Sequence, residues 1–248
     1  APSTIPNDFF QVAGIQPKQH LWLLAKSTLV ASSWLCGYFA LKHLPLSTAG
    51  PIRSTGPLWT IFIAVLWLGE SPSTWQWAGV AIILSSFYAF SFVGKLEGIR
   101  FHRNQWVWLM IAATILGATS SIYDKFLLQR GGLGPSTTQA WFSLYLVVVL
   151  LPFYVLWKRG MWQHSEFQWR WSIPLIGISL LVADILYFTA VQKPDALISV
   201  IAPVRRMSVL ITFFGGVYLF GERSYIRAKS ICLFLLLLGV VLLNWRGT

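Results

Sequence analysis

The sequence predicts an all-α polytopic membrane protein, and three observations carry that prediction. Of the 248 residues, 56% are hydrophobic and only 11% are charged, whereas a soluble domain has about 25% charged residues. The mean hydropathy is +0.63. The apolar residues fall into runs of about 20 residues, which is the length that a helix needs to cross a bilayer. One of these runs, with an arginine inside it, occurs twice in the chain.

Eight apolar runs are predicted to be transmembrane helices, because backbone polar groups in lipid must be hydrogen-bonded within their own segment. Pro51 and Pro57 lie inside the second run and predict kinks or new helix starts there. Ser47 and Asp195 precede the apolar cores of the second and seventh runs, and both are predicted to be helix N-caps. In order, the runs are 21–41, 47–69, 74–94, 105–128, 137–157, 171–192, 196–220 and 228–245.

The second and seventh runs are copies of one pattern. When Glu70 is laid on Glu222, Arg53 falls on Arg205 without a gap. The copies are five runs apart, and this odd separation turns the second copy over relative to the first. Such inverted repeats are frequent among secondary transporters. The second copy has five runs and the first has three, so we expect two further helices before Ala1 and a ten-helix, five-plus-five protein.

The expected domain organisation follows from this repeat. The chain begins with a polar, proline-containing stretch that is predicted to be an extramembrane loop, and two sets of helices follow it. The predicted segments are the loop 1–20, the three remaining helices of the first repeat at 21–94, a connecting loop at 95–104, and the five helices of the second repeat at 105–248.

Several short motifs around these runs resemble the EamA-like branch of the drug/metabolite transporter (DMT) superfamily, in an N-terminally truncated form. The motifs are Ala40-Leu41-Lys42, Leu68-Gly69-Glu70, Trp75-Gln76-Trp77-Ala78-Gly79 and, in the second copy, Phe220-Gly221-Glu222. The resemblance implies two five-helix halves with a substrate site between them. It also implies a carrier for small metabolites, without fixing which metabolite.

Arginines within the apolar runs are the first candidates for substrate binding. Arg53 and Arg205 hold equivalent positions in the two copies, and Arg206 follows directly. A guanidinium group suits a carboxylate or a phosphate because it can donate two parallel hydrogen bonds. The alternative is structural, since each arginine could pair with an acidic group on a neighbouring helix or extend to the membrane interface.

Acidic residues within the runs are the second group of candidates. Asp124, next to Tyr123, lies in the last third of the fourth run, and Asp184 lies in the middle of the sixth, three residues before Tyr187. An intramembrane carboxylate is a hypothesis of function by default. Asp184 could be the counter-ion of Arg205 or could carry a coupling proton, and both alternatives stay open. Lys26, in the first run, is predicted to lie at the membrane interface.

Composition and motifs exclude other classes of protein. The net charge of +11 suggests nucleic acid, but the basic residues, Lys229 among them, lie mostly in short loops, where they contact lipid headgroups and set orientation. The sequence has no phosphate-binding loop, no Gly-x-Ser-x-Gly motif, no His/Cys metal cluster and no paired catalytic carboxylates. We therefore expect neither an enzyme nor a nucleic-acid-binding protein, and no cofactor or metal.

The leading hypothesis is a secondary transporter that works by alternating access on an anionic or zwitterionic solute, such as an amino acid or a phosphorylated sugar. Two alternatives stay open: a proton-coupled exporter of cationic or drug-like compounds, and a non-transporting membrane subunit. The expected partners are a small-molecule substrate and the lipid bilayer. A coupling proton, and a second copy of the chain in a homodimer, are two further alternatives for partners. The expected location is the bacterial inner membrane.

Overall fold

The computed structural model describes residues 12–68, 73–96, 101–159, 168–193, 208–219, 221 and 224–243, and every regular element in these ranges is a helix. The predicted all-helical class is therefore confirmed. Three helices in the described ranges are long and apolar enough to cross a membrane: Gln105–Arg130, Pro135–Leu156 and Ser172–Gln192. The ten-helix inverted repeat remains a prediction.

Within the described ranges the helices follow the predicted apolar runs, and the second run is divided in two. They are α1 (Pro17–Leu41), α2 (Leu46–Ser54), α3 (Gly56–Leu68), α4 (Thr74–Leu96), the short helix η2 (Phe101–Arg103), α5 (Gln105–Lys125), the π-helical η3 (Phe126–Arg130), α6 (Pro135–Lys158), α7 (Ser172–Gln192), α9 (Ser208–Leu219) and α10 (Ile226–Leu243). The chain divides into two compact units: unit 1 comprises Ala1–Ala31 and Tyr123–Ala196, and unit 2 comprises Ser32–Ile122 and Leu197–Thr248.

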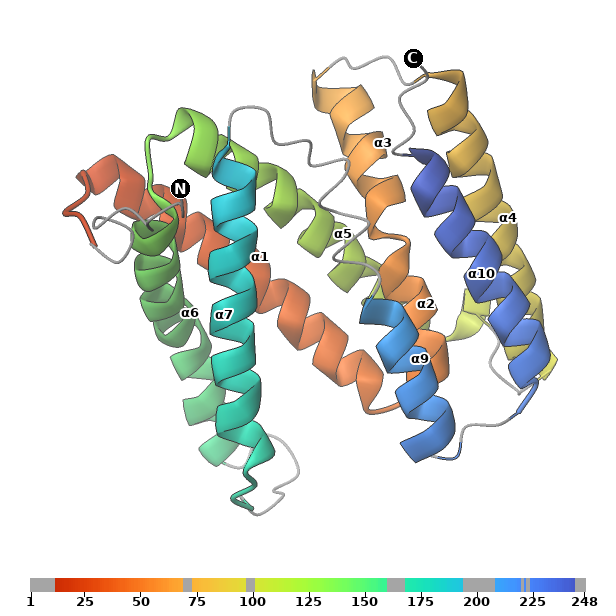
Figure 1. Ribbon diagram of the computed structural model, residues 1–248. Coiled ribbons are helices and arrows are strands. Elements are labelled where there is room, and N and C mark those ends of the chain that lie inside the picture. Colours follow the sequence, from red (N-terminus) through yellow and green to blue (C-terminus); the bar gives the residue numbers. More distant parts are fainter. Residues whose placement is uncertain are drawn as a thin grey trace, which may run out of the picture. The chain divides into compact units, whose positions relative to one another are not determined.

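Unit 1 contains the first turns of α1, the π-helical segment η3, and α6 and α7, which lie side by side (Figure 1). Its apolar cluster is built around Leu23, Leu127 and Leu133. Helix α7 is exposed along most of its length and buries only Asp184, Phe188 and Val191. These three residues recur at the spacing of one helix face, so α7 presents a single inward edge that carries a carboxylate and an aromatic ring.

Unit 2 is organised around α4 and α10, which lie side by side although they are far apart in the sequence (Figure 1). Their close approach depends on Gly239, because a Cβ added there would lie 2.7 Å from Ile83 Cγ1 and 3.0 Å from the carbonyl oxygen of Gly79. A larger cluster joins α2, α4, α5 and α10 through residues such as Ile52, Phe90, Met110 and Cys232. Small residues thus permit helix contact, as is usual for membrane helices.

The second predicted run is broken at Thr55, between α2 and α3. Proline has no backbone N–H, so Pro51 and Pro57 cannot donate the helical hydrogen bonds expected at their positions. Near the break, the Ser54 hydroxyl donates to the Pro51 carbonyl at 2.7 Å, and the Thr55 hydroxyl donates to the Ile52 carbonyl at 2.7 Å. Side-chain hydroxyls therefore supply donors where the backbone ladder ends, and the break predicted from the prolines is present.

Candidate functional site

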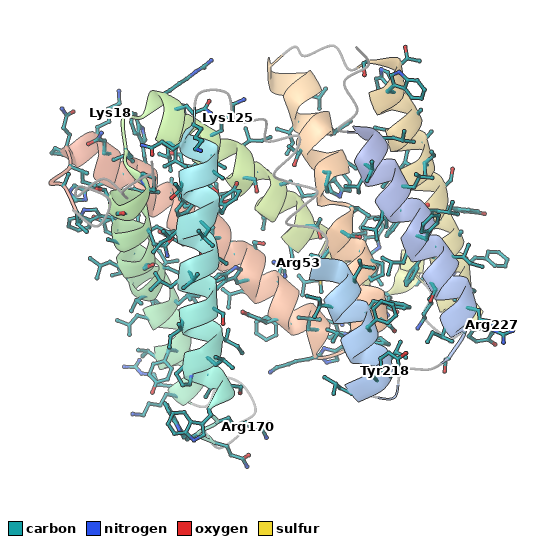
Figure 2. The ribbon with its side chains drawn as sticks, in the orientation of Figure 1. Lys18, Arg53, Lys125, Arg170, Tyr218 and Arg227 are labelled. Carbon is teal, nitrogen blue, oxygen red and sulfur yellow. The ribbon has the colours of Figure 1, made fainter. Side chains whose placement is uncertain are left out.

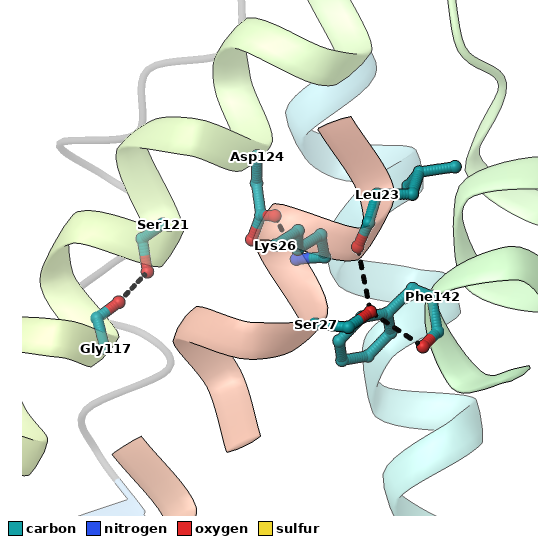
Figure 3. Close-up of polar contacts among 7 residues, drawn as sticks. All are labelled: Leu23, Lys26, Ser27, Gly117, Ser121, Asp124 and Phe142. Atoms are coloured by element: carbon teal, nitrogen blue, oxygen red, sulfur yellow. Dashed lines mark hydrogen bonds and ion pairs between the residues drawn. The ribbon is translucent and has the colours of Figure 1, made fainter. Parts of the chain in front are cut away.

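A buried charge pair is the centre of the candidate site in unit 1. Lys26 of α1 donates to Asp124 Oδ1 near the end of α5 (Figure 3). The two residues are 2% and 4% exposed, respectively. Lys26 was predicted to lie at the membrane interface; the structure shows its side chain buried inside the protein and paired with a carboxylate. The physical reason is that Asp124 offers a full counter-charge inside the protein, so the ammonium has no need to reach water.

Two aromatic rings complete the surroundings of the Lys26 ammonium. Lys26 Nζ lies 4.6 Å from the ring centroid of Phe142 on α6 and 4.9 Å from that of Phe188 on α7. A cation within about 6 Å of an aromatic face is attracted by the ring quadrupole, and more strongly where water is excluded. The ammonium is thus held by one carboxylate and two rings from three different helices. We call Asp124, Phe142 and Phe188 the ammonium cage.

Helix α1 is fixed against α6 next to the cage. The Ser27 hydroxyl lies 2.9 Å from the Leu23 carbonyl oxygen and 3.1 Å from the Phe142 carbonyl oxygen, and its single proton is shared between these two acceptors (Figure 3). Ser27 is fully buried. This contact is made by the residue that follows Lys26 and reaches the backbone of Phe142, so it holds α1 against α6 beside the cage.

The helical turn after Asp124 is wider than an α-helical turn. Residues Phe126–Arg130 form the π-helix η3, which ends where the Gly131 N–H donates to the Phe126 carbonyl at 2.8 Å. From this turn, Gln129 Nε2 donates to the carbonyl of Val191 in the last turn of α7, at 3.1 Å. Short π-helical turns are rare and frequent at functional sites. Here the π-turn connects the end of α5 to the end of α7, the helix that supplies Phe188.

Polar side chains of α6 lie one turn before Phe142. Thr138 is fully buried and Gln139 is 5% exposed. Thr138 Oγ1 and Gln139 Oε1 have no hydrogen-bond partner among the described residues, although Gln139 Nε2 donates to the Ser143 hydroxyl at 3.1 Å. Residues three and four apart share one face of a helix, so both oxygens are on the face of α6 that carries Phe142.

An aromatic group lies beside the cage in the same unit. The Tyr123 ring stacks on Phe126 with a centroid distance of 5.7 Å. The Tyr145 hydroxyl and His20 Nδ1 are 2.7 Å apart, and the His20 ring meets Trp141 edge-on at 4.6 Å. Tyr123 was a predicted site residue, and it is half-buried within this aromatic group.

In unit 2, Arg53 lies near the C-terminal end of α2, just before the helix break (Figure 2). The side chain is half-buried. A Cβ added to Gly37 of α1 would lie 2.9 Å from Arg53 Nη1. The missing side chain of Gly37 therefore provides the space in which the guanidinium lies against α1. This glycine and the helix break together position Arg53. A basic side chain therefore lies at the end of a broken helix.

A second buried lysine lies in unit 2. Lys229 of α10 is 2% exposed, and its Nζ donates to the Ser47 hydroxyl at 2.9 Å. Two predictions are corrected here. Lys229 is not a loop residue facing headgroups, and Ser47 is not an N-cap, because α2 begins at Leu46 after Pro45 and Ser47 lies inside it. Asp195, the other predicted cap, lies outside the described residues.

The remaining predicted site residues are partly described. Asp184 is 7% exposed in the middle of α7, and Phe188 of the cage lies one turn after it on the same face. Tyr187 is half-buried on α7. Arg205 and Arg206 lie outside the described residues. Sequence reasoning missed the roles of Lys26 and Lys229, and the available signal was the rule that a charged residue inside a membrane helix needs a partner.

Comparison with known proteins agrees with the motifs. Residues 7–92 match the EamA-like transporter family. Two curated relatives are proteins from two strains of Pseudomonas aeruginosa, each described as pseudopaline exporter CntI; each is 23% identical to this chain, with 52% of this chain and 52% of the relative covered. The chain therefore spans about half the length of the curated relatives it matches. The predicted likeness to EamA-like transporters of the DMT superfamily is confirmed.

Proposed function

We propose that this chain, which carries an EamA-like transporter domain at residues 7–92, acts in a secondary transporter that moves a small metabolite across a membrane. The observation that carries the proposal is the Lys26–Asp124 pair, buried among helices that include three of membrane-spanning length. Charged side chains inside membrane helices are costly and typically belong to solute or ion pathways. The transport cycle proposed is alternating access, driven by a gradient rather than by nucleotide hydrolysis.

The proposed solute is anionic or zwitterionic, such as an amino acid or a phosphorylated sugar. Basic side chains support this choice, since Arg53 lies at the break between α2 and α3 and discontinuous helices are common at transporter binding sites. The proposed substrate-binding residues are Arg53, Arg205, Arg206, Asp184, Tyr123, Asp124 and Tyr187. We further propose that Asp184 is the counter-ion of Arg205.

The architecture proposed for the whole protein is the five-plus-five inverted repeat of ten helices. In this chain the proposed first repeat covers 21–94, the loop 95–104 connects the repeats, and the second repeat covers 105–248. The broken helix near Arg53 supports it, because the sequence around Arg205 is its aligned copy. The proposed location is a bacterial inner membrane, with the bilayer and a small solute as partners.

A second candidate function is proton-coupled export of cationic compounds. It is favoured by the buried carboxylates Asp124 and Asp184, and by the description of the curated relatives as exporters. A carboxylate that binds either a proton or a cation can couple the two fluxes. In this scheme a proton gradient drives efflux, so the two candidates differ in their response to pH.

Flux into proteoliposomes that contain the full-length protein tests both candidates. Radiolabelled amino acids, sugar phosphates and organic cations would be offered with and without an imposed pH gradient. Gradient-independent uptake of an anion or zwitterion supports the first candidate, and proton-driven flux of a cation supports the second. No flux of any solute contradicts both and favours a non-transporting subunit.

Arginine variants test the proposed site within the same assay. Arg53→Gln and Arg205→Gln remove the guanidinium and keep side-chain polarity. Hydrogen bonds to a charged group contribute about 1.5–3 kcal/mol, so we expect the apparent affinity for the solute to fall roughly tenfold to hundredfold. Arg227→Gln is the matched control, because Arg227 is exposed in the first turn of α10 (Figure 2). Equal flux in all three variants contradicts the site assignment.

A further inference from the structure

We propose that the ammonium cage of Asp124, Phe142 and Phe188 is a binding site for the primary ammonium group of an amine-containing solute, and that Lys26 fills it when no solute is bound. The inference deepens the proposed function, since it assigns a substrate class to Asp124, and it rests on that function for its physiological meaning. The cage itself can be tested by binding alone.

The chemistry of the cage is that of an amine receptor. Asp124 supplies a carboxylate to the Lys26 ammonium, and the two phenylalanine rings lie 4.6 and 4.9 Å from the same nitrogen. Aromatic rings combined with negative charge recognise organic cations by their charge and shape. The terminal group of lysine is a primary alkylammonium, so the structure already contains the proposed ligand group, attached to α1.

Lysine is suited to be a removable occupant. Its charge sits at the end of a flexible four-carbon stem with three rotatable donors, whereas an arginine would be held by a rigid fork. When a solute ammonium enters the cage, its contact with the Asp124 carboxylate replaces the equivalent contact of the Lys26 ammonium. The charge balance inside the protein is then kept only if Lys26 withdraws or meets a second anionic group, such as the carboxylate of a zwitterion.

The two unpaired oxygens of α6 are an independent indication of a ligand. Thr138 Oγ1 and Gln139 Oε1 are buried and have no hydrogen-bond partner among the described residues. Buried polar atoms are nearly always hydrogen-bonded, and exceptions call for an explanation. Both oxygens can accept hydrogen bonds and share the helix face of Phe142. Neither accepts one from the Lys26 ammonium, so they would accept from polar groups of the solute other than the ammonium that replaces it.

Displacement of Lys26 would also change the helix contacts in unit 1. The Lys26–Asp124 pair joins α1 to the end of α5, and the π-turn that follows Asp124 joins α5 to α7 through Gln129. An amine that binds Asp124 breaks the contact between Lys26 and Asp124, whereas the contact between Gln129 and α7 remains. Binding of an amine in the cage thus removes one contact that holds α1.

The test is a thermal-unfolding titration of the purified full-length protein with n-butylammonium chloride. Sodium butyrate and sodium chloride at equal ionic strength serve as controls for anion binding and for salt. In Lys26→Met the internal occupant is absent, so the amine no longer competes with it. If Lys26 fills the cage at least nine-tenths of the time, the amine should bind this variant at least about tenfold more tightly than the wild type.

Three further variants assign the effect to the cage. Lys26→Met/Asp124→Leu lacks the carboxylate and should show no stabilisation by butylammonium beyond that by sodium chloride. Lys26→Met/Phe188→Leu should bind butylammonium more weakly than Lys26→Met, because the ring is lost where no internal ammonium competes. Lys125→Met is the matched control, because Lys125 is the exposed neighbour of Asp124 (Figure 2), and it should titrate like the wild type.

Two results overturn the inference. Equal effects of butylammonium and sodium chloride on folded Lys26→Met show that the cage does not bind amines. Stabilisation of Asp124→Asn by butyrate, without an amine effect on Lys26→Met, assigns an anion site at Lys26 instead. If Lys26→Met does not fold, Lys26→Gln replaces it in the titration, and the same two results decide. Because binding is measured without flux, failure here differs from failure of the transport proposal.

Discussion

Lys26 and Asp124 form the most informative contact at the scale of single residues. Taking two charges out of water costs several kcal/mol per ion, and their mutual attraction offsets this cost only when the geometry is good. Apolar residues of similar volume often give equal or greater stability at such positions. Both residues are almost fully buried. A pair of this kind contributes little net stability, which is consistent with a role in binding a solute.

The pair makes a prediction about folding. Asp124→Leu leaves the Lys26 ammonium buried without its carboxylate, and we expect the free energy of unfolding to fall by about 3–5 kcal/mol. The double variant Lys26→Met/Asp124→Leu removes both charges and should recover most of that loss. The apparent melting temperatures of the two variants in detergent check this. A double variant no more stable than the single one would show that the pair itself holds the helices together.

Gly37 makes a second prediction at this scale. In Gly37→Ala the new Cβ would meet Arg53 Nη1 at 2.9 Å. The far end of a flexible side chain can move, so we expect the protein to fold while the affinity for the solute decreases. In the matched control Gly117→Ala the new Cβ meets, among the described residues, Ser33 Oγ alone, at 3.5 Å. Solute titrations of flux in proteoliposomes compare the two, and equal affinities would show that the position of Arg53 is irrelevant to the solute.

At the scale of elements, the break between α2 and α3 could be predicted because proline acts locally. Pro51 and Pro57 remove backbone donors wherever the chain folds, so the sequence alone indicates an interruption. The N-cap role of Ser47 could not be judged in the same way. The helix starts one residue earlier, after Pro45, and Lys229, distant in the sequence, donates to the Ser47 hydroxyl. Helix breaks can therefore be predicted from the local sequence, whereas the hydrogen-bond partner of a hydroxyl group depends on tertiary contacts.

The contact between α4 and α10 gives a prediction about packing. In Gly239→Ala the new Cβ would lie 2.7 Å from Ile83 Cγ1, 3.1 Å from Ile82 Cγ2 and 3.0 Å from the Gly79 carbonyl oxygen. Backbone atoms cannot yield as side chains do, so we expect destabilisation of about 1–3 kcal/mol. Thermal unfolding measures the loss.

The control for this packing prediction is the same substitution in an open position. No atom of the described residues lies within 4 Å of the Cβ that Gly177→Ala would add in α7. Alanine is favoured over glycine inside a helix by roughly 0.5–1 kcal/mol, so this variant should be as stable as the wild type or more so. If Gly239→Ala and Gly177→Ala unfold at the same temperature, then α4 and α10 can move apart without a loss of stability.

At the scale of the whole molecule, apolar length and composition predicted the helical class correctly. Apolar length and composition did not reveal which charged residues form pairs. A sequence gives the position of a residue along its helix, but it does not give the residue that contacts it from another helix. Lys26 shows this: its place early in the first run suggested the interface, whereas its partner is 98 residues away in the sequence. The alignment of Arg53 with Arg205 remains a prediction, since only Arg53 is described.

The central claim is that the buried Lys26–Asp124 pair serves solute movement rather than folding. The most direct test is solute counterflow in proteoliposomes with the wild type and with Lys26→Met/Asp124→Leu, after both have been shown to unfold at similar temperatures. We predict that the neutral variant is folded and inserted but gives no counterflow. Counterflow at the wild-type rate in the neutral variant would contradict the claim.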